Sequence, residues 1–182
     1  TIVTSPGSGT ASNPAAIAPM VFNPLKTVPA MSPADPAIEA ADGVKSVIFF
    51  SPQRAQADKW LISPVIKVRD NYRVAFSAKA YASQYPETFE IAVAPDGSTN
   101  PADFLKVASI ESLPSTGWGS YTMDLMGYEG MSVRIGLHYV SYDSFLAQVD
   151  DFKVGKADGS GDFVDYGNVV SYEIYLDGIK VG

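Results

Sequence analysis

The sequence predicts an all-β protein built as an antiparallel jelly-roll β-sandwich. Short runs of β-branched and aromatic residues recur along the chain, and clusters of Gly, Pro, Asn and Asp separate them. No long stretch repeats its apolar residues with the period of an amphipathic helix. About eight short strands spaced by turns favour two packed antiparallel sheets over a parallel sheet covered by helices.

Each expected strand is an apolar or alternating run that ends at turn residues. In the run 72–82 (YRVAFSAKAYA), most alternate residues are apolar, so one face of this strand is suited to a core. Turn residues at 70–71 and 95–97 bound this run and the next one. The expected strands cover residues 45–50, 61–68, 72–82, 88–94, 105–110, 119–124, 132–140 and 144–154.

Composition limits the classes of function. The 182 residues have room for one ordinary domain with flanking segments, and 46% of them are hydrophobic, which is enough for a core. The net charge of -7 argues against a nucleic-acid partner, because phosphate binding needs a concentrated basic patch. The absence of cysteine from the sequence excludes disulfides and thiolate metal sites. No apolar run approaches the roughly 20 residues of a transmembrane helix.

The sequence divides into four parts. Residues 1–36 are rich in Pro, Gly, Ser and Ala and are expected to form an N-terminal linker, with a short edge strand near 18–22. Residues 37–155 hold the expected sandwich, and the polar segment 156–168 predicts a second linker. Residues 169–182 predict a strand, a tight turn at Asp-Gly and another strand. This tail is expected either to open a following domain or to dock on the sandwich.

Several motifs occur in one order between residues 58 and 154. The segment 58–64 (DKWLISP) is similar to the DNWLISP phrase of cleaved-adhesin modules, the repeats appended to gingipain-type proteases and many Bacteroidetes surface proteins. Segments 99–104 (TNPADF), 118–130 (WGSYTMDLMGYEG) and 133–152 continue the resemblance to this family, which is grouped with choice-of-anchor domains. The Asp/Gly-rich segment that the family carries before its first strands is not visible in residues 29–44.

This resemblance implies a galactose-binding-domain-like jelly roll without catalytic activity. It implies a secreted module at a bacterial cell surface, associated with the outer membrane, that adheres to a glycan or to a host or surface protein. Neighbouring domains of the same chain are expected, and residues 169–182 resemble the start of an immunoglobulin-like or fibronectin-III-like domain. The sequence starts without the basic and apolar regions of a signal peptide, so we expect any export signal to have been removed. The alternative is a structural spacer that holds another domain.

Ligand contacts are expected on loops at one edge of the sandwich, where a rigid scaffold presents variable side chains. Tyr85, Tyr142 and Asp143 are the candidate ligand-binding residues. The tryptophans at 60 and 118 are expected to be buried rather than to form sugar-stacking platforms. The single histidine, at 138, falls on the polar face of its strand and is expected to be solvated rather than catalytic.

A calcium site is the last prediction. Alternation over 144–154 places Phe145, Ala147, Val149 and Asp151 on the inward face, where an unpaired carboxylate is costly. A bulge, a hydrogen-bonded partner or a bound cation would each resolve this conflict. The family resemblance implies a structural Ca²⁺ coordinated by an acid on the closing strand and by backbone carbonyls. The other ligands would then come from the N-terminal part of the sequence. The candidate metal ligands are Asp151, Asp150, Glu39 and Asp42.

Overall fold

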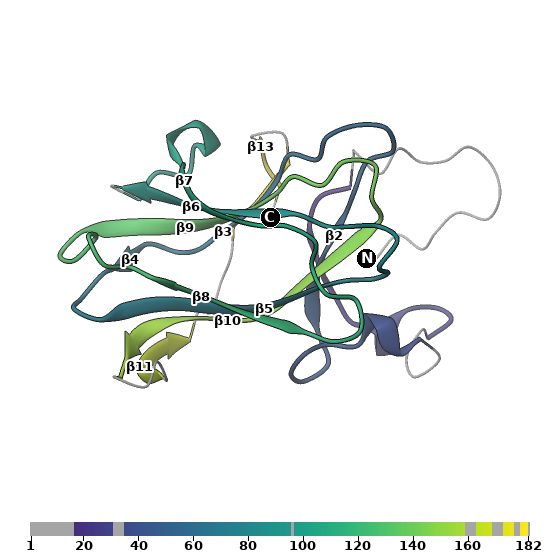
Figure 1. Ribbon diagram of the computed structural model, residues 1–182, viewed down its shortest axis with the longest axis horizontal. Coiled ribbons are helices and arrows are strands. Elements are labelled where there is room, and N and C mark those ends of the chain that lie inside the picture. The colour runs from purple at the N-terminus through teal and green to yellow at the C-terminus, as the bar shows by residue number, and fades with distance from the viewer. Residues whose placement is uncertain are drawn as a thin grey trace.

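Two antiparallel β-sheets pack face to face in the structure (Figure 1). This computed structural model describes residues 17–30, 35–95, 97–158, 163–168, 173–176 and 179–181. Within those ranges the regular elements are strands and short 3₁₀-helices. The prediction of an all-β antiparallel jelly-roll sandwich is therefore confirmed. In the described ranges, no helix has the length and apolar character needed to cross a membrane.

Sheet 1 has the strand order β1-β2-β10-β5-β8, and β11 also pairs with β10. Every pair in this sheet is antiparallel, and β10 lies between β2 and β5 although it follows them far along the chain. Such non-consecutive neighbours are expected of jelly-roll connections. The bounds are β1 (Met20–Phe22), β2 (Ser46–Phe50), β5 (Tyr72–Ala80), β8 (Gly119–Asp124), β10 (Leu146–Ala157) and β11 (Phe163–Asn168).

Sheet 2 has the strand order β13-β12-β3-β9-β6-β7, and β4 also pairs with β9. Its strands are β3 (Lys59–Ile62), β4 (Ile66–Lys67), β6 (Phe89–Pro95), β7 (Leu105–Ile110), β9 (Ser132–Tyr139), β12 (Glu173–Leu176) and β13 (Ile179–Lys180). Among the described residues, three 3₁₀-helices lie in the connections: η2 (Pro24–Lys26), η3 (Pro36–Ile38) and η4 (Pro101–Asp103). Each has an Asn or Asp cap followed by proline, which fits the first position of a helix.

The core lies between the two sheets and follows the two-residue period of the strands. Along β9, alternate residues from Val133 to Tyr139 are buried and face sheet 1, as alternation predicts. Aromatic rings join the sheets at one end of this core. The Phe49 ring of β2 meets the Phe89 ring of β6 edge-on, with centroids 5.0 Å apart, and lies 5.4 Å from the Tyr139 ring of β9.

The terminal segments contain strands. Strand β1 forms at the position of the short edge strand expected near 18–22, and Phe22 is buried with Ile38, Ile48 and Leu146. The expected linker 156–168 contains the end of β10 and the strand β11. An edge strand needs at most one apolar face, so a polar composition does not prevent it from forming. In the tail, β12 pairs with β3 and thereby extends sheet 2. Residues 1–16 and the expected Asp-Gly turn at 177–178 lie outside the described residues.

Candidate functional site

An aromatic cluster lies at the end of the sandwich that carries the β5–β6 and β9–β10 loops. We define it as Phe50, Tyr81, Tyr85 and Phe145. The Phe145 ring is central, with its centroid 5.2 Å from Tyr81, 6.2 Å from Tyr85 and 6.3 Å from Phe50. Phe145 and Tyr85 are each 42% exposed, so the cluster presents aromatic surface to solvent. Aromatic surface held on loops above a rigid sandwich can bind an apolar ligand face.

The predicted ligand residues lie on these loops in different roles. Tyr85 belongs to the aromatic cluster, and Tyr142 is 61% exposed on the loop that leads to Phe145. Asp143 has a positive φ of 47°, and its Oδ1 accepts a hydrogen bond from the backbone N–H of Arg54 at 2.8 Å. The Asp143 carboxylate therefore ties two loops together.

Phe145 was expected to face inward, and that expectation is wrong. Strand β10 begins at Leu146, so Phe145 still belongs to the loop, where strand alternation does not apply. Its backbone oxygen accepts a hydrogen bond from the N–H of Ser51 at 3.0 Å. Sequence reasoning missed Phe145 as a candidate contact, although its position beside Tyr142 and Asp143 was the available signal.

A buried polar network lies beneath the aromatic cluster. Glu87 is 0% exposed, and its carboxylate accepts hydrogen bonds from the Tyr139 hydroxyl at 2.6 Å and from the Phe145 N–H at 2.9 Å. Burial raises the pKa of Glu87, and these hydrogen bonds only partly oppose the shift. Burial, reinforced by the nearby Glu87 carboxylate, also raises the pKa of Tyr139. A second link is made by Ser51, whose Oγ accepts from the Ser144 N–H at 3.0 Å.

The two predicted metal ligands on β10, Asp150 and Asp151, have protein partners. Asp150 Oδ2 accepts hydrogen bonds from the backbone N–H groups of Ala41 at 2.8 Å and Asp42 at 3.2 Å. Asp151 has a positive φ of 51° at an irregularity in the pairing of β10 with β5. Its carboxylate forms an ion pair with Lys153 at 2.7 Å. A bulge and a charged partner thus accommodate Asp151, which does not point into the core.

Calcium binding stays a prediction. Within the described residues, no group of three or more His, Asp or Glu side chains is placed to hold a metal ion. If Ca²⁺ binds only the folded protein, millimolar CaCl₂ raises the melting temperature by mass action, and Asp150→Asn removes that increase. Thermal unfolding in calcium and in excess chelator measures the effect. Equal melting temperatures in the two buffers contradict the site.

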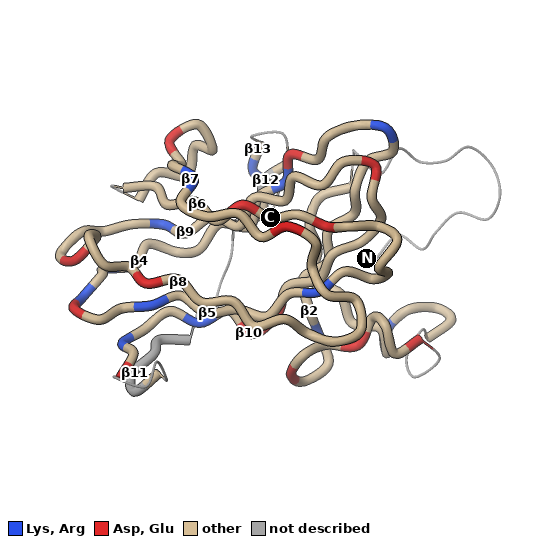
Figure 2. Tube along the Cα trace, viewed as in Figure 1, with Lys and Arg blue, Asp and Glu red and all other residues tan. Residues whose placement is uncertain are grey.

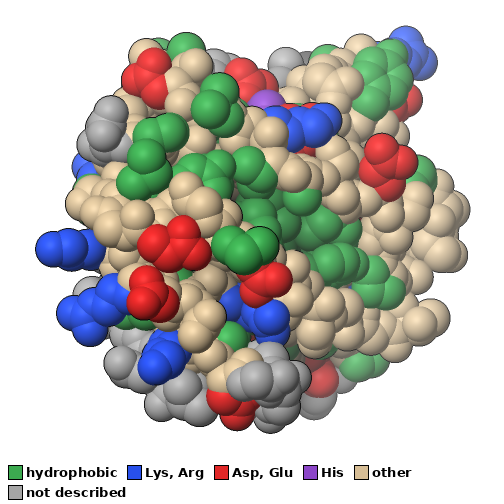
Figure 3. Space-filling view, turned by 60° about the vertical axis from the view of Figure 1, so that its left-hand side comes forward, with side chains coloured by type: hydrophobic (Ala, Val, Ile, Leu, Met, Phe, Trp, Pro, Cys, Tyr) green, Lys and Arg blue, Asp and Glu red, His purple; other side chains and the backbone are tan. Residues whose placement is uncertain are grey.

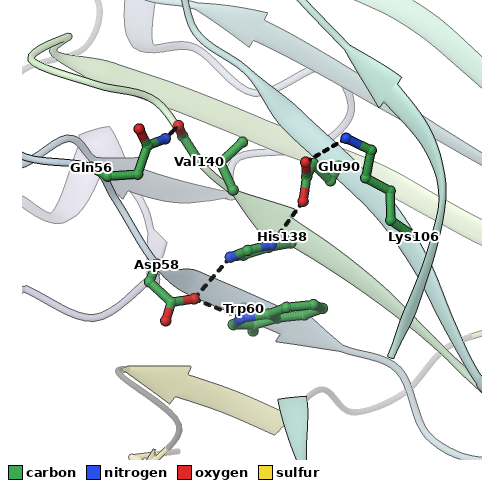
Figure 4. A network of polar contacts seen from close by, with 7 residues as sticks. All are labelled: Gln56, Asp58, Trp60, Glu90, Lys106, His138 and Val140. Carbon is green, nitrogen blue, oxygen red and sulfur yellow. Dashed lines mark hydrogen bonds and ion pairs between the residues drawn. The ribbon is translucent and has the colours of Figure 1, made fainter. Parts of the chain in front are cut away.

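A second polar and aromatic group lies on the outer face of sheet 2 (Figure 4). The rings of Trp60 and His138 stack with centroids 4.0 Å apart and an interplanar angle of 10°. Asp58 Oδ1 lies 2.8 Å from His138 Nε2 and accepts from Trp60 Nε1 at 2.9 Å. Glu90 Oε2 lies 3.1 Å from His138 Nδ1. Both ring nitrogens of His138 therefore face carboxylates, and the contacts join β3, β9 and β6.

One of the two carboxylates in this group also contacts a lysine. Glu90 pairs with Lys106 of β7 at 2.7 Å. Burial acts to raise the pKa of Glu90, but hydrogen bonds and charges from Lys106 and His138 outweigh it, so this pKa lies below its ordinary range. Figure 3 shows the histidine at the surface beside acidic and basic side chains, above a band of hydrophobic ones. Asp and Glu are otherwise spread over both sheets and their loops (Figure 2).

The two tryptophans differ in burial. Trp60 is 6% exposed, which confirms that it is buried, although it packs with Phe104 outside sheet 2 rather than between the sheets. Trp118 is only partly buried, so the expectation that it belongs to the core is wrong. It precedes β8, and Lys79 Nζ lies 5.0 Å from its ring centroid. Desolvation lowers the pKa of Lys79, while the charges of Glu39 and Asp35 act against this shift.

No protein-family model matches the sequence, and no curated protein matches it. The fold is similar to solved structures of cleaved adhesin domains of Lys-gingipain. The K1 domain from Porphyromonas gingivalis W83 has a TM-score of 0.54 and 15% identity, over 77% of this chain and 91% of that chain.

Two further domains of Lys-gingipain give similar matches. The K3 domain from the same organism has a TM-score of 0.51 and 17% identity, over 62% and 72% of the two chains. The K2 domain has a TM-score of 0.51 and 20% identity, over 63% and 74%. The fold is thus similar to that of the gingipain-type cleaved adhesin domains that the sequence motifs resemble.

Proposed function

We propose that this protein is a non-catalytic extracellular module that binds a glycan at a bacterial surface through its aromatic cluster. The observation that carries the proposal is the exposure of Tyr85 and Phe145 on loops held by a rigid sandwich. Aromatic ring faces pack against the apolar faces of sugar rings, and tyrosine hydroxyls add hydrogen bonds. The fold similarity to cleaved adhesin domains supports a surface module of this kind.

The size of the exposed surface favours a glycan over a protein ligand. Three large aromatic side chains, Tyr85, Tyr142 and Phe145, are exposed at this end. A stable protein interface buries about 800 Å² on each partner, so most of such an interface would have to come from residues outside these three rings. A short stretch of sugar needs only a few stacked rings and hydrogen bonds.

The environment of the histidine favours binding without catalysis. Both ring nitrogens of His138 are directed at Asp58 and Glu90, and its ring is stacked on Trp60. A general base has to reach the proton of a nucleophile with one of these nitrogens. The contacts of His138 instead connect neighbouring strands of sheet 2, which is a structural role.

A glycan array tests the proposed function. We expect the protein to bind a subset of printed glycans, and Tyr85→Ala and Phe145→Ala each to weaken that binding by about tenfold, which corresponds to about 1.4 kcal/mol. Met126→Ala is the matched control, because Met126 is 82% exposed but lies on the loop that follows β8. It should leave binding unchanged.

Two other outcomes would contradict glycan recognition. Binding to host-matrix proteins but to no glycan would assign the aromatic cluster to protein adhesion. Binding to neither class of target would favour the structural spacer. Outer-membrane association is a separate proposal, tested by fractionating cells that express the full protein.

A further inference from the structure

One buried carboxylate contacts the loop that carries Tyr142 and Phe145. Glu87 lies two residues before β6 and is 0% exposed. Its Oε2 accepts from the Tyr139 hydroxyl, which is itself 0% exposed, at 2.6 Å. Its Oε1 accepts from the backbone N–H of Phe145 at 2.9 Å. The carboxylate therefore connects the core to the loop residue at the centre of the aromatic cluster.

We infer that Glu87 is the positioning residue of the binding loop and that its carboxylate holds Phe145 in the exposed, ligand-contacting orientation. This inference rests on the proposed function, because it assigns a positioning residue to the same binding site. Glu87 itself is fully buried and touches no ligand. It acts through the backbone of Phe145.

The chemistry of the contact requires a group with two acceptors. A carboxylate has two oxygens that accept in different directions, so it can receive the Tyr139 hydroxyl and the Phe145 N–H together. An apolar side chain would fill the same space but would remove the acceptor that the two donors share. Burial raises the pKa of Glu87, so keeping it ionised near neutrality costs stability. A packing role alone does not explain a charged group at this position.

The hydrogen bond to the Phe145 amide helps to set the direction of the Phe145 side chain. The chain leaves the β9 ladder after Tyr139 and rejoins β10 at Leu146. Between these points, the Ser144 N–H and the Phe145 carbonyl bind to Ser51. With its carbonyl fixed by Ser51 and its N–H fixed by Glu87, the backbone of Phe145 has both polar groups engaged. The direction of its side chain follows from that backbone.

Site-specific amide exchange in Glu87→Gln tests the inference without any ligand. The glutamine keeps the size of the side chain and one acceptor oxygen, but its NH₂ group cannot accept a second hydrogen bond. We expect either the Phe145 amide or the Tyr139 hydroxyl to lose its hydrogen-bond partner. We also expect the rate of amide hydrogen exchange across residues 141–146 to rise at least tenfold. The melting temperature of the variant checks that the fold is retained.

A matched control and a second variant complete the experiment. Glu90→Gln removes a carboxylate three residues away that faces outward to Lys106, and it should leave exchange at 141–146 unchanged. Glu87→Leu removes both acceptors and should accelerate exchange further than Glu87→Gln. If exchange at 141–146 in both Glu87 variants equals that of the wild type, Glu87 does not position the loop.

Glycan binding then separates this inference from the proposed function. For the array glycan with the highest wild-type signal, Glu87→Gln should lower affinity by about tenfold while the protein stays folded. Faster exchange with unchanged affinity overturns the positioning role. Faster exchange in a protein whose wild type binds no glycan refutes the glycan function and supports Glu87 as the residue that orders the loop.

Discussion

Replacing Phe49 with alanine should lower the free energy of unfolding by about 3–5 kcal/mol. Phe49 is 0% exposed in β2 of sheet 1, and its ring contacts Phe89 and Tyr139 of sheet 2. The side chain therefore spans the sandwich. A cavity at this position has walls from both sheets, and neither wall can close without disturbing its own strand pairing. Urea denaturation measures this loss of stability, and the m-value should stay unchanged.

Phe145→Ala is the matched control for this experiment. It removes the same side chain from a position that is 42% exposed, so the loss should be below about 1 kcal/mol. Phe145→Ala is expected to weaken ligand binding instead. Equal losses of stability in the two variants would contradict the division between a core ring and a surface ring.

Replacing Gly136 with valine should destabilise the protein by about 1–3 kcal/mol through overpacking. A Cβ added at Gly136 would lie 2.9 Å from Phe104 Cδ1 and 2.9 Å from Trp60 Cζ3. These two rings are buried and their centroids lie 5.2 Å apart, so neither can move away freely. Thermal unfolding measures the loss, and near-ultraviolet circular dichroism reports the altered packing of Trp60.

Gly117→Ala is the control for added volume at a glycine. A Cβ at Gly117 meets nothing within 4 Å, so the change in stability should stay within about 0.5 kcal/mol. A Gly136 variant as stable as the wild type would show that the ring of Phe104 does not rest on this position.

The alternation of apolar and polar residues predicted the interior of the sandwich well, because it is a local property of each strand. In β9, four alternate residues from Val133 to Tyr139 face the core as expected. The same rule failed at Phe145, which precedes β10, and at Asp151, where the register of β10 shifts. Both failures occur where the chain leaves regular strand geometry. A bulge changes which face a residue occupies, and its position depends on the partner strand.

The candidate site was predictable only in its exposed part. Aromatic residues in turn-rich segments, such as Tyr85 and Tyr142, could be assigned to loops from the sequence. The role of Glu87 could not, because its donors, the Phe145 N–H and the Tyr139 hydroxyl, lie 58 and 52 residues away. Nothing local distinguishes this glutamate from the other acidic residues. Its burial follows from the way distant loops meet at one end of the sandwich.

The pairing of β12 with β3 has a consequence for synthesis of the chain. Residues 173–176 form the neighbour of residues 59–62, so this side of sheet 2 is completed well after β3 itself has been made. At ordinary rates of elongation, the delay is on the order of ten seconds. During that interval, the nascent chain presents the edge of β3 with unpaired backbone groups, which can pair with another nascent chain. Until residues 173–176 pair with it, the edge of β3 is therefore a site at which two nascent chains can aggregate.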